Sequence, residues 1–127
     1  MFTSYYANLK KLPKDLVPVS ISVGKPRWWK GRHEPRLCPT WAMLKMSPAK
    51  YDRHFKKILD QLDPQAIFEE LGDNAVLLCW EKPPDRCHRR CVAEWFEAAL
   101  GIEVPEYGFD RSSCPAYADM KRKARPK

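Results

Sequence analysis

The segment from Leu77 to Arg90, LLCWEKPPDRCHRR, gathers an unusual set of reactive side chains. It contains two cysteines, one histidine, two carboxylates and three arginines around a double proline. Asp85 is of a residue type that favours helix N-termini, so it predicts a helix that carries Cys87 and His88 in its first turn. The apolar run before the prolines predicts a strand, so the segment is either a chemical site or a strand-to-helix corner.

The start of a helix attracts anions because its first backbone N–H groups have no partner within the helix. Arginine side chains add charge-assisted donors that suit phosphate or carboxylate. The predicted anion-binding residues of this segment are Arg86, Arg89 and Arg90. A thiol near positive charge is favoured as thiolate, so Cys87 is a candidate nucleophile, as is Cys79 at the end of the strand. Either Glu81 or His88 is the candidate general base.

Structural alternatives exist for the same residues. Cys79 has the character of a small buried apolar residue, and Cys91, one turn after Cys87, is better explained by packing than by chemistry. A zinc site is a lesser alternative because the segment has no Cys-x-x-Cys pair. Its ligands would be Cys79, Cys87, His88 and Cys91. The spacing needed for a cysteine phosphatase loop and the motif of the zinc deaminases are both absent. No cofactor is predicted.

A second chemically dense segment is the loop Gly24 to Arg36, GKPRWWKGRHEPR. It holds five basic residues, one acidic residue and two tryptophans. The pair Trp28 and Trp29 either packs in the core or stacks on a nucleobase. The chain has a net charge of +7, and five positive charges lie in its last seven residues, KRKARPK. Clustered basic residues indicate either a solvated end or attraction to nucleic acid phosphates.

The pattern of elements predicts a single α/β domain over residues 1–110 and a basic tail over 111–127. The strands expected are 2–6, 17–23, 74–80 and a last short one near 101–108. Helices are expected after Ser47-Pro48, after Asp63-Pro64 and after Asp85, and the last two end at glycines. This order indicates a small, mostly parallel sheet flanked by helices, Rossmann-like in type. Both dense segments follow strands, where such sheets bind ligands.

The sequence also limits where the protein acts. No apolar stretch resembles a signal peptide, and the longest apolar run is too short to cross a membrane. We therefore expect a cytoplasmic protein without membrane attachment. The five cysteines are an odd number, and we expect them to be reduced thiols.

The segment from Leu77 onward resembles the signature of the "domain of unknown function 488" family. That signature is Leu-Cys-x-Glu, a proline-containing turn, Cys-His-Arg and a helix with Val-Ala-Glu-Trp. The upstream runs FTSYYANLKKL, PVSISVGKPRWWKG, CPTWAMLK and LDPQAIFEELG agree in order, so the resemblance reaches to about Glu106. Its motif falls on Cys79, Glu81, Cys87, His88 and Arg89. The resemblance implies a small α/β domain in which Lys25 and Arg27 face the same pocket, and it implies no reaction.

Three functions remain open from the sequence. The first is an enzyme acting on a phosphate-bearing substrate, a nucleotide or nucleic acid, through the Cys/His/Arg segment. The second is a nucleic-acid-binding module without catalysis that uses Trp28, Trp29 and the basic tail. The third is a structural corner held by thiols or metal.

Overall fold

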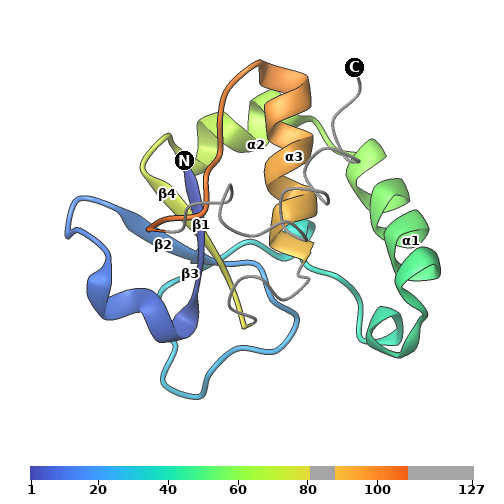
Figure 1. Cartoon of the computed structure of the whole chain (residues 1–127), viewed down its shortest axis with the longest axis horizontal. Helices are drawn as coiled ribbons and strands as arrows, with labels where there is room; N and C mark the ends of the chain where they lie inside the picture. The colour runs from blue at the N-terminus through green and yellow to red at the C-terminus, as the bar shows by residue number, and fades with distance from the viewer. Residues whose placement is uncertain (81–87, 109–127) are drawn as a thin grey trace.

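The protein is built around a four-stranded sheet in which every strand runs parallel to its neighbours. The computed structural model describes residues 1–80 and 88–108. The strands lie in the order β1-β4-β2-β3 (Figure 1). Their bounds are Phe2–Tyr5 for β1, Val17–Ser20 for β2, Arg32–His33 for β3 and Ala75–Cys79 for β4. The predicted α/β class is therefore confirmed, and the predicted strands at the start of the chain are shorter than expected.

The central strand β4 is buried along its whole length, as its uninterrupted apolar sequence predicts. Leu77 lies opposite Thr3 of β1 on one side and Val19 of β2 on the other. Alternate residues of β4 face opposite sides of the sheet. Ala75 and Leu77 pack into one apolar cluster, and Val76 and Leu78 pack into another.

The helices α1 and α2 begin where the Ser-Pro and Asp-Pro pairs predict. Helix α1 spans Pro48–Asp60, and the Ser47 hydroxyl accepts a hydrogen bond from the Lys50 backbone N–H at 3.4 Å. Helix α2 spans Pro64–Leu71, and the Asp63 carboxylate accepts bonds from the next two available amides. Gly72 follows α2 with a φ of 86°, a conformation that glycine adopts without steric cost.

Helix α3 spans His88–Leu100 and ends at Gly101 as predicted. Its predicted N-cap, Asp85, lies outside the described residues. Among those that are described, no helix combines the length and the apolar character that crossing a bilayer requires.

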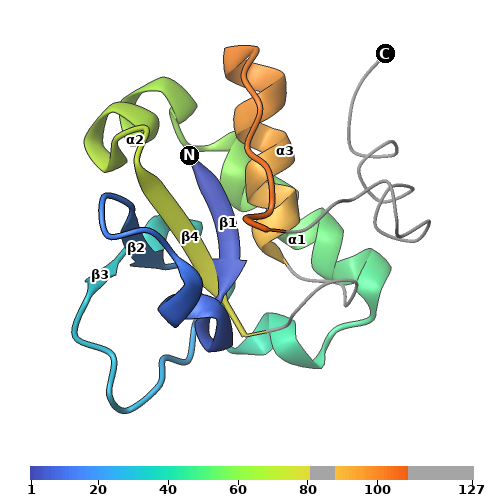
Figure 2. The same ribbon diagram turned by 60° about the vertical axis from the view of Figure 1, so that its left-hand side comes forward.

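The two faces of the sheet have different covers (Figure 2). All three α-helices pack on one face, where Phe55, Ile67 and Phe96 join the strand residues in a buried cluster. The opposite face is covered by the 3-10 helix η1, Tyr6–Lys11, and by part of the loop that follows β2. Within residues 1–80 and 88–108 the arrangement thus differs from a doubly wound sheet, in which α-helices cover both faces.

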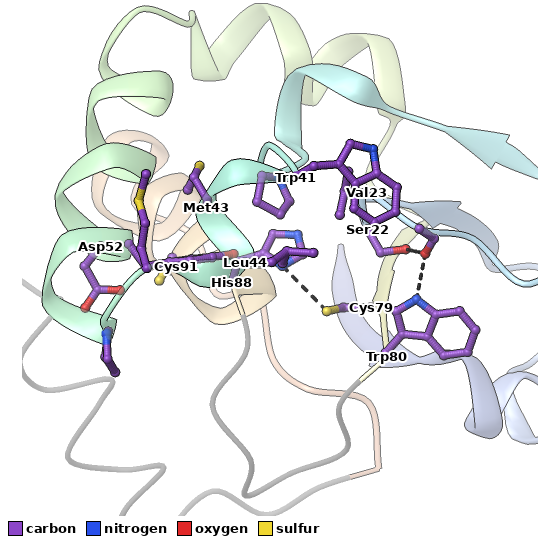
Figure 3. Close-up of a pocket in the computed structure, with 15 residues that line it drawn as sticks. Ser22, Val23, Trp41, Met43, Leu44, Asp52, Cys79, Trp80, His88 and Cys91 are labelled. Carbon is purple, nitrogen blue, oxygen red and sulfur yellow. Dashed lines mark hydrogen bonds between the residues drawn. The ribbon is translucent and has the colours of Figure 1, made fainter.

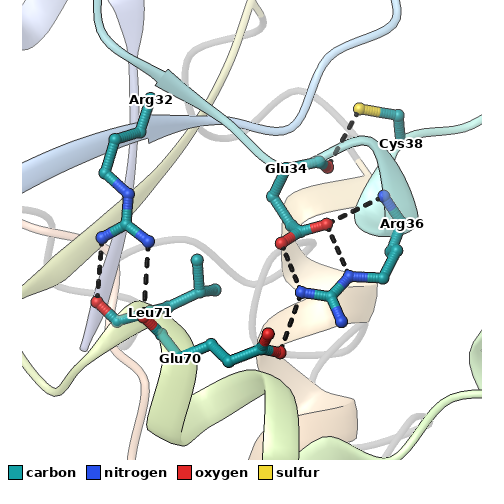
Figure 4. A network of polar contacts seen from close by, with 6 residues as sticks. All are labelled: Arg32, Glu34, Arg36, Cys38, Glu70 and Leu71. Carbon is teal, nitrogen blue, oxygen red and sulfur yellow. Dashed lines mark hydrogen bonds and ion pairs between the residues drawn. The ribbon is translucent and has the colours of Figure 1, made fainter.

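The loop predicted from Gly24 to Arg36 contains the two-residue strand β3 and the start of the short 3-10 helix η2, Pro35–Leu37, which sequence reasoning missed. Two arginines fasten this segment to α2 (Figure 4). The Arg32 guanidinium donates to the carbonyls of Glu70 and Leu71 at 3.3 Å each. Arg36 binds the Glu34 carboxylate through two nitrogens at 2.8 Å and reaches Glu70 at 3.0 Å. A further 3-10 helix, η3, spans Ala42–Lys45 and leads into α1.

The last predicted strand, near 101–108, is reduced to a single parallel bridge between Thr3 and Glu106. The backbone of this segment is held to β1 by hydrogen bonds from Thr3 N–H to the Pro105 carbonyl and from Tyr107 N–H to the Thr3 carbonyl. Its chain therefore runs beside β1, on the far side of the sheet from β3.

Candidate functional site

A cavity of about 370 Å³ lies at the carboxyl edge of the sheet. Its walls come from the end of β2, the end of β4, η3, the first turn of α1 and the first turn of α3. The volume falls within the range of small-molecule sites, roughly 300–1,000 Å³. Most of the lining is apolar, with Trp41, Met43, Trp80 and Tyr51 among the larger side chains (Figure 3).

The cavity lies where the strand connections diverge. The chain leaving β2 passes to β3 on one side of it. Beyond β4 the chain passes through α3 to the segment beside β1, on the other side. Ligands of parallel α/β sheets bind at such a switch point, beyond the carboxyl ends of the strands. Both chemically dense segments reach this edge, because Gly24 and Cys79 both line the cavity.

Cys79 and His88 form the chemical centre of this site. The Cys79 sulfur lies 3.6 Å from His88 Nδ1, and His88 Nε2 lies 2.6 Å from the Ile21 carbonyl oxygen. A carbonyl oxygen only accepts, so His88 Nε2 carries the hydrogen and donates it. Nδ1 of a neutral ring then has its lone pair directed at the Cys79 sulfur. The carbonyl of Ile21 therefore fixes the tautomer that lets His88 accept a proton from a thiol.

Burial keeps the His88 ring neutral. The ring is nearly inaccessible and lies edge-on to Phe55, with centroids 5.4 Å apart. Desolvation lowers the pKa of His88 from 6.5 to about 4, against a smaller raising contribution from the bond to Ile21. His88 is thus an uncharged base at neutral pH.

The Cys79 sulfur is disulfide-bonded in this structure, whereas Cys38 and Cys91 are not part of a disulfide. The expectation that all five cysteines are reduced is therefore wrong for Cys79. A disulfide sulfur has no proton to give, so proton transfer to His88 requires Cys79 in its reduced form.

Arg89 and Arg90 do not line the cavity. Arg89 is buried and binds the Glu106 carboxylate through two nitrogens, at 2.9 and 3.0 Å. Arg90 is also buried and donates to the Val104 carbonyl at 2.7 Å. The structure gives both arginines a structural role in place of the predicted anion-binding one. The physical reason is that acceptors from the segment after α3 meet their guanidinium groups inside the protein.

The chain is similar to one family of known proteins. A family model described as Domain of unknown function DUF488 matches residues 22–96. The chain belongs to this family. The match includes Cys79, His88 and the residues of η3, so the region common to the DUF488 domain contains the cavity described above. No curated protein and no solved structure matches the chain.

The remaining predicted residues of the DUF488 domain fall into two groups. Three of them, Glu81, Arg86 and Cys87, lie outside the described residues. Lys25 and Arg27 are exposed on the loop beyond Gly24, and neither lines the cavity.

The tryptophan pair of the same loop is divided between two roles. Trp28 is 59% exposed. Trp29 is half-buried against the second apolar cluster, and its indole nitrogen donates to the Arg32 carbonyl at 3.1 Å. Of the two predicted alternatives, packing therefore holds for Trp29, and the exposed Trp28 does not pack in the core.

A metal site finds no further support in the described residues. Within residues 1–80 and 88–108, no group of three or more histidine, cysteine or acidic side chains is arranged to hold a metal ion. The predicted zinc ligands include Cys87, which lies outside these ranges.

Sequence reasoning missed the aromatic walls of the site. Trp41 is the N-cap of η3, which has no periodic pattern, and the apolar pattern predicts Trp80 only as the end of a strand. One signal was present for Trp80, because a large aromatic residue at the last position of a buried strand must reach the carboxyl edge of the sheet. No sequence signal identifies the Ile21 carbonyl, since every residue has one.

Proposed function

We propose that the protein is an enzyme that uses the reduced Cys79 thiol as a nucleophile on a phosphate-bearing substrate, a nucleotide or nucleic acid. The alignment of Cys79, His88 and the Ile21 carbonyl at the cavity carries the proposal. A nucleophile, a base within reach of it and a third group that orients the base is the arrangement that recurs in covalent catalysis.

The first step is transfer of the thiol proton from Cys79 Sγ to His88 Nδ1. The low pKa of His88 refers to a ring beside an uncharged disulfide sulfur. A thiolate 3.6 Å away would favour the protonated ring by about 5 kcal/mol at an effective dielectric constant of 20. The thiolate and the imidazolium therefore stabilise each other, and the pair forms more readily than either group would ionise alone.

In the second step the thiolate forms a bond to the electrophilic atom of the substrate, and the bond to the leaving group breaks. The leaving group departs with the proton held on Nδ1, and water then releases the product from sulfur while His88 takes a proton from that water. This sequence restores the thiol, so no electron donor is needed within the cycle. Reduction of the disulfide beforehand requires a dithiol or glutathione-type reductant.

Three observations support the choice of substrate. The apolar, aromatic lining suits a planar base, and the exposed Lys25 and Arg27 lie on the loop that continues from the cavity wall. The net charge of +7 favours polyanions. A cytoplasmic location is part of the proposal, because the reducing conditions there would hold Cys79 as a thiol.

The test is alkylation of the reduced protein by iodoacetamide from pH 5 to 9, with each cysteine followed by peptide mass spectrometry. We expect Cys79 to react at pH 6–7 faster than an ordinary thiol with a pKa of about 8.5. His88→Gln, which can still donate to the Ile21 carbonyl, should slow this reaction at least about tenfold. Cys38 is an internal reference, because burial and the nearby Glu34 raise its pKa to about 12.

Protection links the thiol to a substrate. Adenosine monophosphate should slow alkylation of Cys79 and leave the rate at Cys38, which does not line the cavity, less affected. If Cys79 reacts no faster than Cys38, or if His88→Gln leaves its rate unchanged, the catalytic proposal is wrong and the corner is architectural.

A further inference from the structure

Three of the five tryptophans expose more than half of their side chains. Trp28 is 59% exposed, Trp41 is 66% exposed and Trp80 is 52% exposed. Large aromatic side chains are usually well buried, so three exposed together indicate a surface that binds something. No packing requirement within residues 1–80 and 88–108 accounts for this exposure, because Tyr6 and Trp29 already close the second apolar cluster beneath it.

The three rings form one surface at the carboxyl edge of the sheet. The buried Tyr6 lies edge-on between two of them, with ring centroids 6.4 Å from Trp28 and 4.9 Å from Trp80. Gly24 joins Trp80 to Trp41. Its carbonyl accepts from the Trp80 indole nitrogen at 2.6 Å, and a Cβ atom placed on it would lie 3.4 Å from the Trp41 ring. We call the surface made by Trp28, Trp80 and Trp41 the aromatic strip (Figure 3 shows its last two members beside Ser22 and Val23).

The support of the aromatic strip is rigid. The Tyr6 hydroxyl lies 2.6 Å from the Ser20 hydroxyl and 2.5 Å from the Ser22 hydroxyl, and Ser22 in turn donates to the Gly24 carbonyl at 2.6 Å. These bonds hold the Tyr6 ring, which contacts Trp28 and Trp80. They also hold the Gly24 carbonyl, which accepts the hydrogen bond from the Trp80 indole. A pre-oriented aromatic surface loses little conformational entropy when a flat ligand stacks on it.

The chain segments that carry Trp28 and Trp41 are rich in basic residues. Residues 16–51 contain seven lysines and arginines against one acidic residue, Glu34. That carboxylate is occupied by Arg36 at 2.8 Å. Arg32 and Arg36 are bound to α2, whereas Lys25, Arg27 and Lys30 are exposed and form no ion pair within the described residues. The exposed Lys45 and Lys50 follow Trp41 in the chain, so positive charge is available to a ligand from the segments of both Trp28 and Trp41.

We infer that the aromatic strip binds single-stranded nucleic acid, with bases stacked on Trp28, Trp80 and Trp41 and phosphates beside Lys25 and Arg27. Stacked aromatic side chains within a positive groove are the usual means of holding unpaired strands. A duplex hides the faces of its bases, and an acidic peptide has no comparable planar groups. The idea that this nucleic acid is the substrate bound in the cavity rests on the proposed function. The inference that the aromatic strip binds it does not.

The test measures anisotropy of a fluorescein-labelled 12-nucleotide oligothymidine with the full chain at 50 and 200 mM salt. Substituting alanine for Trp28, Trp41 or Trp80 should each weaken binding about 5- to 100-fold. Lys25→Ala should lower the slope of log affinity against log salt by about 0.7, as loss of one phosphate contact to a single strand does. Lys14→Ala is the matched control. This exposed lysine precedes β2 at the opposite edge of the sheet, so the slope should not change.

Two comparisons distinguish binding on the aromatic strip from binding to the basic tail or to positive charge alone. Glutamine replacement of the basic residues in 121–127 removes the positive charge of the tail. The tryptophan variants should lose affinity for oligothymidine in that background as well. A 12-base-pair duplex and poly-glutamate should compete at least about tenfold less well than oligothymidine. Equal competition by either, or unchanged affinity in all three tryptophan variants, would overturn the inference.

The reactivity of Cys79 and the affinity of the tryptophan variants together distinguish this inference from the catalytic proposal. If alkylation shows an inert Cys79 while the tryptophan variants lose affinity, the protein binds nucleic acid without the proposed chemistry. A reactive Cys79 together with unchanged binding in the tryptophan variants would support the catalytic proposal and overturn the binding surface.

Discussion

Replacing His88 with glutamine should remove a large part of the acid sensitivity of the fold. In the disulfide form His88 has a pKa of about 4, and the unfolded chain returns it to 6.5. Below pH 6.5 the His88 ring therefore takes up a proton in the unfolded state, whereas in the folded state it stays neutral until the pH approaches 4. The contribution of the neutral, buried His88 ring to the free energy of unfolding is fully present above pH 6.5 and is lost as the pH falls towards 4.

The magnitude follows from the two pKa values. At about 1.4 kcal/mol per pKa unit, this one residue should lower the free energy of unfolding by about 3 kcal/mol between pH 7 and pH 4. Other groups also contribute to the pH dependence, Glu34 among them, because hydrogen bonds from Arg36 lower its pKa in the folded state and this stabilisation is lost as the pH falls below the ordinary pKa of the carboxyl group. The informative quantity is therefore the pH dependence of the wild type minus that of the variant.

The assay is urea denaturation followed by circular dichroism at pH 7 and pH 4, without reductant and with the disulfide verified by thiol titration. His88→Gln keeps a donor for the Ile21 carbonyl and should narrow the difference between the two pH values by about 3 kcal/mol. His54→Gln, the same substitution at an exposed position of α1, should leave that difference as in the wild type. If both variants show the wild-type difference to within about 0.5 kcal/mol, His88 is not held neutral by burial.

Two further predictions concern parts of the fold that support the site. Glu106→Gln should lower the free energy of unfolding by about 3 kcal/mol in urea denaturation at pH 7, since it leaves the buried Arg89 charge without its carboxylate. Methionine at both positions should recover part of that loss, and no recovery would contradict a cost arising from the unpaired charge. Gly31→Ala should cost about 1–3 kcal/mol because its Cβ would lie 2.7 Å from the Trp29 ring. Gly24→Ala, where the nearest contact is 3.4 Å, should cost clearly less, and equal thermal midpoints for the two variants would refute the packing argument.

The elements that the sequence predicts well are those with local causes. The apolar run of β4 and the capping pairs before α1 and α2 each identify an element within a few residues of its true bounds. Strand β3 has no such cause. It is two residues long, and it exists because Arg32 is bound to the end of α2 and the Glu34 N–H donates to the Ser20 carbonyl. Such contacts depend on residues far away in the chain, so no local pattern predicts them.

The candidate site shows the same division. Residue type and strand position are enough to name Cys79 and His88 as candidates, but they leave Cys87 open as the nucleophile and Glu81 open as the base. The arginines after them are predicted to bind an anion because they follow a helix start, yet the direction of a helical side chain depends on what packs against it. Glu106, 17 residues after Arg89, provides the buried carboxylate that decides its role. An acidic residue in the segment after a helix is therefore a reason to test for an internal ion pair before assigning an anion site.

The alternation of β4 explains why one strand end serves both proposed functions. Cys79 follows Ala75 and Leu77 on the helix-covered face, so its side chain must meet His88 of α3. The next residue, Trp80, leaves the strand on the other side and lies 4.9 Å from Tyr6, which belongs to the opposite cluster. A strand of this kind places a thiol and an aromatic ring on the two sides of the same edge. A nucleobase stacked on Trp80 would therefore lie at the entrance of the cavity whose inner wall carries Cys79.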